Sequence, residues 1–364
     1  MSWPTVPFTE VLKDVTGGNT KTLQSDYEEV GQYPIIDQGQ EMIGGYSDDI
    51  SCLCQTKPPV IIFGDHTKTL KFVDFPFCLG ADGTKVLEAK DGADPKYLFY
   101  ALHDIHIPEA GYSRHFKYLK AGLIPLPPLE EQKRIAGILD QADALRRLRT
   151  RALEKLNTLG QAIFHEMFGV DLKEAKKQSL SELIEVRSSL ADPRTQENSI
   201  LPHVGPEHIA SGSGRIDWKN VRTCGEDGVI SGKYRFEDGD VIFSKIRPNL
   251  NKVAIADQIG MCSADMYALH APNGEITERT LHFILGSSKF LAYASTVSNR
   301  ANIPKMNRSQ LLAFETVVPE IQKQIEFQGK LDLIEFQRVA ASALSSKSEA
   351  LFASLQHRAF RGEL

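Results

Sequence analysis

The stretch PLPPLEEQKRIAGILDQADAL (residues 125–145) passes from a proline cluster into a charged run whose apolar residues recur at helical spacing. The two adjacent prolines hold the chain extended, while Glu130 and Glu131 favour the start of a helix electrostatically. Gly169 supplies a stop signal. A helix from Glu130 to Phe168 would be about 57 Å long, at roughly 1.5 Å per residue. The sequence therefore predicts one long helix near the middle of the chain.

Assigning heptad positions a and d along this helix gives apolar residues at eight of ten sites, which predicts a coiled-coil stripe. The ten assigned positions are Ile135, Ile138, Ala142, Leu145, Arg149, Ala152, Leu156, Leu159, Ile163 and Glu166. Arg146, Arg147 and Arg151 stay largely off this seam. Together with Arg149 they give the coil a charged character, and we assign to these four arginines the binding of a partner protein.

The segment VVPEIQKQIEF (residues 317–327) introduces a second helix in a similar way, with a single proline. Its residues Gln322, Lys323 and Ile325 match the glutamine, lysine and isoleucine at positions 132, 133 and 135. The second seam is poorer and contains several serines, so this helix needs the first as its partner. Its apolar positions are Ile325, Leu331, Ile334, Ala341, Leu344, Leu351 and Leu355.

The chain repeats itself. Four residues near the end of the first helix recur 192 positions later, namely Leu159, Ile163, His165 and Phe168 as Leu351, Leu355, His357 and Phe360. Three upstream segments also have counterparts: residues 8–16 match 180–188, residues 59–68 match 240–248, and residues 97–102 match 281–286. Such self-similarity indicates a duplication of one mixed domain followed by one long helix.

The duplication predicts an α+β fold with two pseudo-symmetric mixed α/β domains separated by two long antiparallel coiled-coil helices. The domains are residues 1–128 and 170–318, and the helices are residues 129–169 and 319–364. Connectivity favours the antiparallel arrangement, because one helix leaves the first domain and the other leaves the far end of the second. A ligand with its own two-fold symmetry, such as duplex DNA, would suit two related domains.

Composition narrows the class of protein. The 364 residues are 41% apolar and 24% charged, as expected for a globular protein of two domains. We find no signal for export and no apolar run long enough to span a membrane, so we expect a cytoplasmic protein. Lysine and arginine number 11 against 17 acidic residues in 1–128, and 18 against 18 in 170–318. Neither domain is basic, so this chain alone should bind DNA weakly, and something else would have to supply most phosphate contacts.

The cysteines, Cys52, Cys54, Cys78, Cys224 and Cys262, are odd in number and contain no CxxC pair. This pattern favours reduced thiols over a disulfide framework or a zinc site. We therefore expect no metal in this chain.

Local basic and amide side chains gather in four loops, and these are the types that contact base edges or phosphates. After apparent strands, residues 63–72 and 243–254 carry His66, Thr67, Lys68, Lys71, Lys245, Arg247, Asn249, Asn251 and Lys252. Before the two helices, residues 111–120 and 298–308 carry Arg114, His115, Lys117, Arg300, Asn302 and Lys305. Surface loops are normally polar, so about half of these residues would be merely solvated.

Signals of catalysis are sparse, and we assign no catalytic or cofactor-binding residue. The chain has no phosphate-binding loop of the GxxxxGK[ST] form, no HExxH and no GxSxG. His66 beside Asp65 could be a general base, but a histidine in a polar loop is more often a contact residue.

The order of domain, LPPLEEQKRIAGILDQADALRRLRTRALEKLNTLGQAIFHEMFG, second domain and a helix ending in HRAFRGEL resembles the specificity subunit of type I restriction-modification enzymes. The resemblance covers essentially the whole chain. It implies that each domain is a target recognition domain for one half of a bipartite asymmetric DNA site, with the helices as a ruler. It also implies two modification subunits that bind S-adenosylmethionine, and restriction subunits, if present, that use ATP and Mg²⁺.

Three alternatives stay open. The chain could be the recognition subunit of a type IIB-like system, which would share this architecture. It could be a duplicated coiled-coil adaptor that binds only proteins. As an enzyme, it could be a hydrolase that uses His66 or the cysteines.

Overall fold

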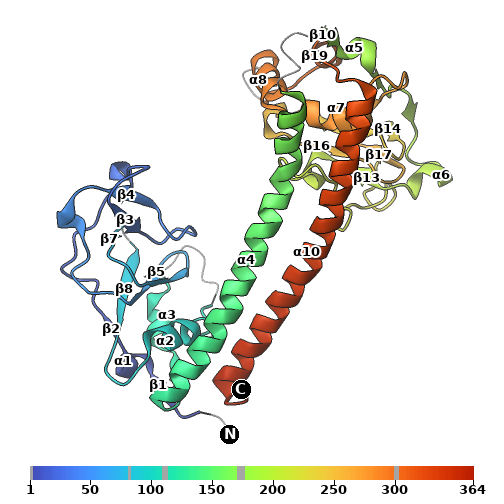
Figure 1. Ribbon diagram of the computed structural model, residues 1–364. Coiled ribbons are helices and arrows are strands. Elements are labelled where there is room, and N and C mark those ends of the chain that lie inside the picture. Colours follow the sequence, from blue (N-terminus) through green and yellow to red (C-terminus); the bar gives the residue numbers. More distant parts are fainter. Residues whose placement is uncertain (1–2, 81–82, 109–113, 170–176, 299–302) are drawn as a thin grey trace. The chain divides into compact units, whose positions relative to one another are not determined.

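The computed structural model describes residues 3–80, 83–108, 114–169, 177–298 and 303–364 (Figure 1). The chain forms two compact units, and each has its own hydrophobic core. Unit 1 comprises residues 1–150 and 343–364, and unit 2 comprises residues 151–342. Each unit combines a mixed α/β domain with parts of the two long helices, α4 (Leu129–Phe168) and α10 (Ile321–Arg361). The predicted fold class is confirmed.

The domain of unit 1 has one four-stranded sheet, in the order β2-β8-β5-β6, and one three-stranded sheet, in the order β4-β3-β7. A further antiparallel pair joins β1 to β9. The strands are β1 (Thr5–Pro7), β2 (Leu12–Asp14), β3 (Tyr33–Ile36), β4 (Gly45–Ser47), β5 (Val60–Gly64), β6 (Leu70–Val73), β7 (Cys78–Leu79), β8 (Thr84–Ala89) and β9 (Leu123–Pro125). The helices are α1 (Phe8–Val11), α2 (Pro95–Leu102) and α3 (Phe116–Lys120), with short 3-10 turns η1 (Gln24–Asp26) and η2 (Ile50–Cys52).

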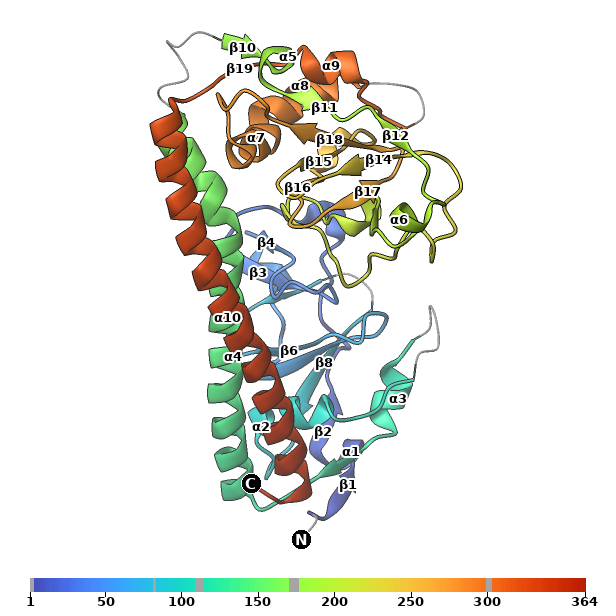
Figure 2. The ribbon, with the colours of Figure 1, turned by 90° about the vertical axis from the view of Figure 1, so that its right-hand side faces the viewer.

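Strand β5 explains why unit 1 is layered. Its residues are all buried, so the run VIIFG is apolar without alternation, as expected for a strand covered on both faces. Ile61 and Phe63 pack with α2 and the N-terminal part of α4, whereas Val60 and Ile62 pack against the second sheet. Helix α2 therefore lies between the four-stranded sheet and the long helices (Figure 2).

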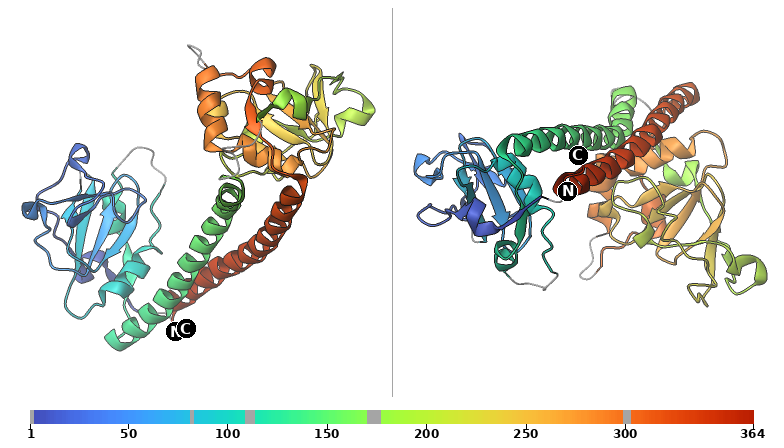
Figure 3. Two further views of the ribbon diagram at one scale, coloured as in Figure 1. Left: turned by 45° about the horizontal axis from the view of Figure 1, so that its top comes forward. Right: turned by 90° about the horizontal axis from the view of Figure 1, so that it is seen from below.

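Unit 2 repeats this plan. Its sheets have the orders β11-β18-β15-β16 and β12-β14-β17-β13, and β10 pairs with β19. The strands are β10 (Lys177–Ser179), β11 (Glu185–Val186), β12 (Leu190–Ala191), β13 (His203–Val204), β14 (Lys233–Phe236), β15 (Val241–Ser244), β16 (Val253–Ile255), β17 (Gly260–Cys262), β18 (Met266–His270) and β19 (Glu315–Val317). The helices are α5 (Leu180–Leu183), α6 (Gln196–Ser199), α7 (Glu278–Leu285), α8 (Ser288–Val297) and α9 (Arg308–Leu312), with 3-10 turns η4 (Pro206–His208) and η5 (Pro248–Leu250). Helices α7 and α8 cover one face of the sheet β11-β18-β15-β16 (Figure 3).

The two long helices pack in antiparallel fashion within each unit. In unit 1, Arg146 of α4 lies over the ring of Phe352 and pairs with Glu349 at 3.2 Å. In unit 2, Phe164 of α4 contacts Phe327 of α10, with ring centroids 5.5 Å apart. Residue numbers rise along α4 as they fall along α10, which confirms the predicted direction.

Half of the predicted seam of α4 is wrong. The positions assigned to a are correct, but Leu145 and Leu159, assigned to d, are 43% and 40% exposed. The inward positions follow one residue later and include Arg146 and Gly160. Gly160 serves there because a Cβ would come within 2.9 Å of the Phe283 ring. A charged residue and a glycine in the seam are invisible to a pattern of apolar residues.

The two helices begin with the same buried glutamine, and our alignment of the second one is wrong. Gln132 donates to the carbonyl of Pro127 at 2.8 Å and accepts from the amide of Asp94 at 2.8 Å. Gln324, and not Gln322, makes the equivalent bonds, to Pro319 at 2.7 Å and from Thr277 at 2.9 Å. Ile325 is accordingly 53% exposed. The glutamine follows its bonded proline by five residues in both helices, which keeps the offset of 192 seen in the rest of the repeat, whereas pairing Gln322 with Gln132 breaks it.

The cysteines also differ from expectation. Cys52 and Cys78 form a disulfide, with Cα atoms 5.1 Å apart, so the prediction that all thiols are reduced is wrong. The fold brings η2 and β7 together over Ile35, which the spacing of cysteines does not reveal. Among the described residues, no group of three or more His, Cys, Asp or Glu side chains could hold a metal ion. Within that same part of the chain, no helix has the length and apolar character needed to cross a membrane.

Candidate nucleic-acid interface

In unit 2 the two polar loops predicted from the sequence meet. Lys245 directly follows strand β15, and its amide donates to the carbonyl of Asp265 at 3.0 Å. The carbonyl of Lys245 accepts from the amide of Met306 at 2.8 Å, and the amide of Arg247 donates to Pro304 at 2.7 Å. Backbone bonds thus fix the loop after β15 against the segment before α9.

Unit 1 builds the same scaffold from different residues. The amide of Asp65 donates to Gly83 at 2.6 Å, and its carbonyl accepts from the amide of His115 at 2.8 Å. The carboxylate of Asp65 accepts from the amide of Phe116 at 2.7 Å. Lys245 and Asp65 are therefore equivalent positions, as are Asp265 and Gly83.

The predicted residues of unit 2 differ in their accessibility. Arg247 and Asn249 are exposed, and Arg247 has a left-handed backbone with φ of 46°. Asn251 is half-buried, and its carbonyl accepts from the amide of Gly212 at 2.9 Å. Lys252 donates to the carbonyl of Pro206 at 2.7 Å. Arg300 and Asn302 lie outside the described residues.

In unit 1 the predicted residues fall into two groups. Thr67, Arg114 and Lys117 are exposed, and His66 and Lys68 are half-buried. Lys68 has φ of 60°, and its ammonium lies 3.4 Å from the carbonyl of Ile107.

Lys71 and His115 are placed differently from the others, because both are buried. The ammonium of Lys71 pairs with Asp37 at 3.4 Å, and burial lowers the pKa of Lys71. The Lys71 ammonium and the His115 ring therefore serve the interior of unit 1 and are not presented at its surface.

The fold adds residues to these loops that no motif in the sequence singles out. Asp265 and Tyr267 flank the start of β18 and lie beside Lys245, whose ammonium is 5.2 Å from the centre of the Tyr267 ring. Gln38 of unit 1 accepts from the amide of His66 at 3.3 Å. No local signal identifies them, since each is distant in sequence from the loop it supports. The hydrogen-bonding pattern of neighbouring strands places them there.

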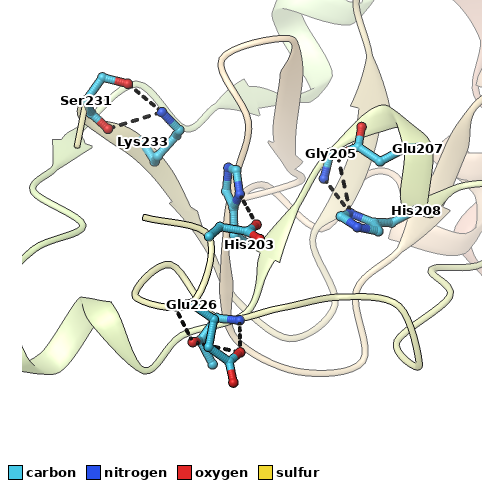
Figure 4. A network of polar contacts seen from close by, with 9 residues as sticks. His203, Gly205, Glu207, His208, Glu226, Ser231 and Lys233 are labelled. Atoms are coloured by element: carbon cyan, nitrogen blue, oxygen red, sulfur yellow. Dashed lines mark hydrogen bonds and ion pairs between the residues drawn. The ribbon is translucent and has the colours of Figure 1, made fainter. Parts of the chain in front are cut away.

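A polar network at the edge of the second sheet of unit 2 consists of internal contacts (Figure 4). His203 bonds to Asp227 through Nδ1 at 3.0 Å. Lys233, 7% exposed, donates to the carbonyl and hydroxyl of Ser231. These bonds tie the loop before β14 to the sheet, so we assign the network a structural role.

The arginines proposed to bind a partner are only partly available. Arg146 and Arg149 face α10, and Arg149 donates to the carbonyl of Leu344 at 2.9 Å. Arg147 is exposed and pairs with Asp143 at 2.5 Å, and Arg151 is exposed. Large apolar side chains are exposed on the α10 part of unit 2 instead. This α10 stripe consists of Ile321, Ile325, Leu333, Phe336 and Val339, with exposed fractions of 41%, 53%, 63%, 70% and 56%.

Unit 2 also contains a cleft of about 570 Å³ between the loop at residues 212–215, α7 and the long helices. At its rim Arg215 and Arg338 both pair with Glu335, and the two arginines lower the pKa of Glu335 to about 2. His282 lines the cleft with its Nε2 atom enclosed, and burial lowers the pKa of His282 to about 4.

Comparison with known proteins agrees with the fold. A family model described as the type I restriction modification DNA specificity domain matches residues 2–158. The specificity subunit of the type I restriction enzyme EcoDI from Escherichia coli is 34% identical over 188 residues, covering 50% of this chain but only 40% of that protein. The EcoR124I/EcoR124II specificity subunit, also from Escherichia coli, is 22% identical over 353 residues, covering 90% of this chain and 86% of that protein.

Two solved structures share the fold. The S subunit of a type I restriction-modification system from M. genitalium has a TM-score of 0.60 at 15% identity, covering 99% of this chain and 96% of that one. A chain from a structure on complex assembly and conformational transition of the type I R-M system has a TM-score of 0.53 at 17% identity, covering 100% and 98%.

The duplicated mixed domain with paired long helices is the fold of the S subunits of type I restriction-modification systems, and residues 2–158 match the specificity domain of these systems. The resemblance drawn from the sequence is therefore confirmed. The chain is similar to the specificity (S) subunits of these enzymes, and it spans less than half the length of the EcoDI subunit in that match.

Proposed function

We propose that this chain is the sequence-specific DNA-recognition subunit of a type I restriction-modification complex, in which each unit reads one half of a bipartite asymmetric site. The observation that carries the proposal is the repeated scaffold. Equivalent backbone bonds hold Lys245 in unit 2 and Asp65 in unit 1, but the surrounding side chains differ. One scaffold with two sets of side chains is what two different half-sites require.

Exposed loop residues supply the direct readout in this proposal. Arg247 and Asn249 in unit 2, and Arg114 in unit 1, are exposed and of the types that bond base edges. The left-handed backbone at Arg247 supports this role, because strained conformations cluster at functional sites. Lys71 and His115 instead support the loops from inside.

The long helices act as the spacer and as the docking surface for two modification subunits. The α10 stripe supports docking, because side chains such as Phe336 with a 70% exposed fraction are the kind that a protein partner covers. Those subunits would bind S-adenosylmethionine and supply most phosphate contacts, in keeping with the net charge of −5 of this chain. Restriction subunits, where present, would use ATP and Mg²⁺.

The test is reciprocal loss of half-site specificity. Complexes carrying Arg247→Ala with Asn249→Ala, or His66→Ala with Arg114→Ala, would be used to select binding sites from random duplexes and to map methylated positions in a host. Each pair should relax only the half-site of its own unit, at a cost of about 1 to 3 kcal/mol for each lost bidentate contact. Equal degradation of both half-sites, or a wild-type complex without sequence preference, would overturn the proposal.

A further inference from the structure

The first observation concerns two lysines in unit 2. Lys245 and Lys305 come from loops 60 residues apart in sequence, yet an antiparallel bridge between Ile246 and Lys305 holds the two loops together. Burial, and next the nearby Lys305 ammonium, lower the pKa of Lys245. The two ammonium groups therefore repel each other in the free protein.

The second observation is that a single carboxylate serves this pair. Asp265 lies 3.9 Å from the ammonium of Lys305, and both side chains are 45% exposed. Within the described residues, the ammonium of Lys245 has no hydrogen bond or ion pair, and its contact is the face of Tyr267. Two cations that share one carboxylate leave an uncompensated positive charge at a half-buried site, which an anion would neutralise.

The third observation is that the two positions equivalent to Lys245 and Lys305 carry one cation in unit 1, while Lys85, at the position of Tyr267, already pairs with Asp14 at 3.8 Å. Asp65 occupies the position of Lys245, because equivalent backbone bonds hold both residues. Arg114 corresponds to Lys305, since each directly precedes the residue whose amide closes the loop. A carboxylate and a guanidinium thus replace the two ammonium groups. The two units share a scaffold and differ in charge.

We propose that Lys245 and Lys305 form a two-lysine seat for one backbone phosphate of the DNA, oriented by Asp265, and that unit 1 has no equivalent seat. This inference rests on the proposed function and deepens it. In this proposal Lys245 contacts the phosphodiester backbone and positions the DNA. Arg247 and Asn249 then read the bases in unit 2. The second unit then carries more of the salt-dependent affinity than the first.

The test uses the complete complex with its modification subunits and compares wild type with the double variant Lys245→Ala, Lys305→Ala. Lys289→Ala is the control, because Lys289 is an exposed lysine of the same unit on α8, over the ring of Phe314. Affinity would be measured from low to moderate salt on the cognate duplex and on duplexes with either half-site scrambled. The double variant should bind every duplex more weakly by a similar factor, on the order of tenfold, and its salt slope should fall by about 1. Lys289→Ala should leave the slope unchanged.

A scan with neutral methylphosphonate linkages identifies the contacted phosphate. One linkage on the half-site of unit 2 should weaken wild type and leave the double variant unaffected. Relaxed base preference at an unchanged salt slope would overturn the inference, since the lysines would then read bases. Unchanged affinity of a folded double variant would overturn it as well. Failure of the proposed function would look different, because the wild-type complex itself would then show no preference for the cognate duplex.

Discussion

The buried glutamines at the starts of α4 and α10 each join three parts of a unit with one side chain. Gln324 lies at 0% exposure and bonds the carbonyls of Pro319 and Glu275 and the amide of Thr277. We expect Gln324→Ala to lower the free energy of unfolding by about 2 to 4 kcal/mol, because buried backbone groups lose their partners. Gln322→Ala should change it by less than about 0.5 kcal/mol, since Gln322 is exposed. Urea unfolding measures both, and equal effects would contradict our assignment.

His282 predicts a dependence of stability on pH. Its pKa is lowered to about 4 by burial, while an unfolded histidine titrates near 6.5. The unfolded chain binds the proton more readily, so this contribution to stability is present above pH 6.5 and is lost as pH falls toward 4. The loss for this group is at most roughly 3 kcal/mol.

The measurement compares wild type with His282→Gln in urea at about pH 7.5 and about pH 4.5, on either side of the expected loss. The difference in stability between the two proteins should shift in favour of the variant at the lower pH. A difference that stays constant across this range would show that His282 is not held neutral by its surroundings.

The sequence located the polar loops correctly, but it did not show which of their side chains are buried. The loops around Lys245 and Asp65 were located from polar residues after apolar runs. Lys71 was assigned to the same surface, but it lies on β6, where alternate residues are buried. Its ammonium group forms an ion pair with Asp37 in the interior. Only the pairing of β5 with β6 decides which lysine is buried.

At the scale of elements, α10 presents two aromatic residues with opposite roles. Phe327 is 0% exposed and contacts Phe164, Phe168 and Phe283, whereas Phe336 is 70% exposed. Phe327→Ala should cost about 3 to 5 kcal/mol of stability, and Phe336→Ala less than about 0.5 kcal/mol. Thermal or urea unfolding of the two variants checks this.

The Phe336→Ala variant also tests the docking of modification subunits. Phe336→Ala should weaken the capture of modification subunits while the isolated chain stays folded. Native mass spectrometry of co-expressed subunits should show two modification subunits per wild-type chain and fewer per Phe336→Ala chain. A wild-type ratio that stays at one to one with partner in excess would contradict the docking proposal.

The long helices themselves were the most predictable elements, because proline precedes both of them and α4 also has an acidic first turn and a glycine directly after its last residue. Which residues form the inner faces of these helices could not be predicted from the sequence. Arg146 and Gly160 occupy the seam for reasons that lie on α10 and α7, namely Glu349 and Phe283. Helix existence is a local property, whereas the choice of face depends on the neighbour.

For the whole molecule, the continuous helices make the ruler testable. One heptad would be inserted into α4 between Thr150 and Arg151, and one into α10 between Ser342 and Ala343, which are the boundaries of the two units. Seven residues add about 10.5 Å and keep the seam in register to within about 20°. At 3.4 Å per base pair, this equals about three base pairs of DNA.

Site selection with this variant should return both half-sites unchanged and a non-specific spacer longer by about three base pairs. Insertion into α4 alone is the control, since it breaks the pairing with α10 and should lower stability. An assembled double-insertion variant that keeps the original spacer would show that the helices do not set the distance.

The C-terminal end of α10 completes the hydrophobic core of unit 1. This core contains Phe360, whose ring is 5.7 Å from that of Tyr97, and the indole of Trp3 donates to the carbonyl of Ala359 at 2.9 Å. The domain of unit 1 is synthesised first, but residues 359 and 360 of its core are synthesised after all of unit 2. Its apolar core therefore stays partly exposed until the end of α10 has been made. A chain terminated before that segment ends with the surface open to chaperones and proteases. Cellular quality control would thus remove such truncated recognition subunits before they meet DNA.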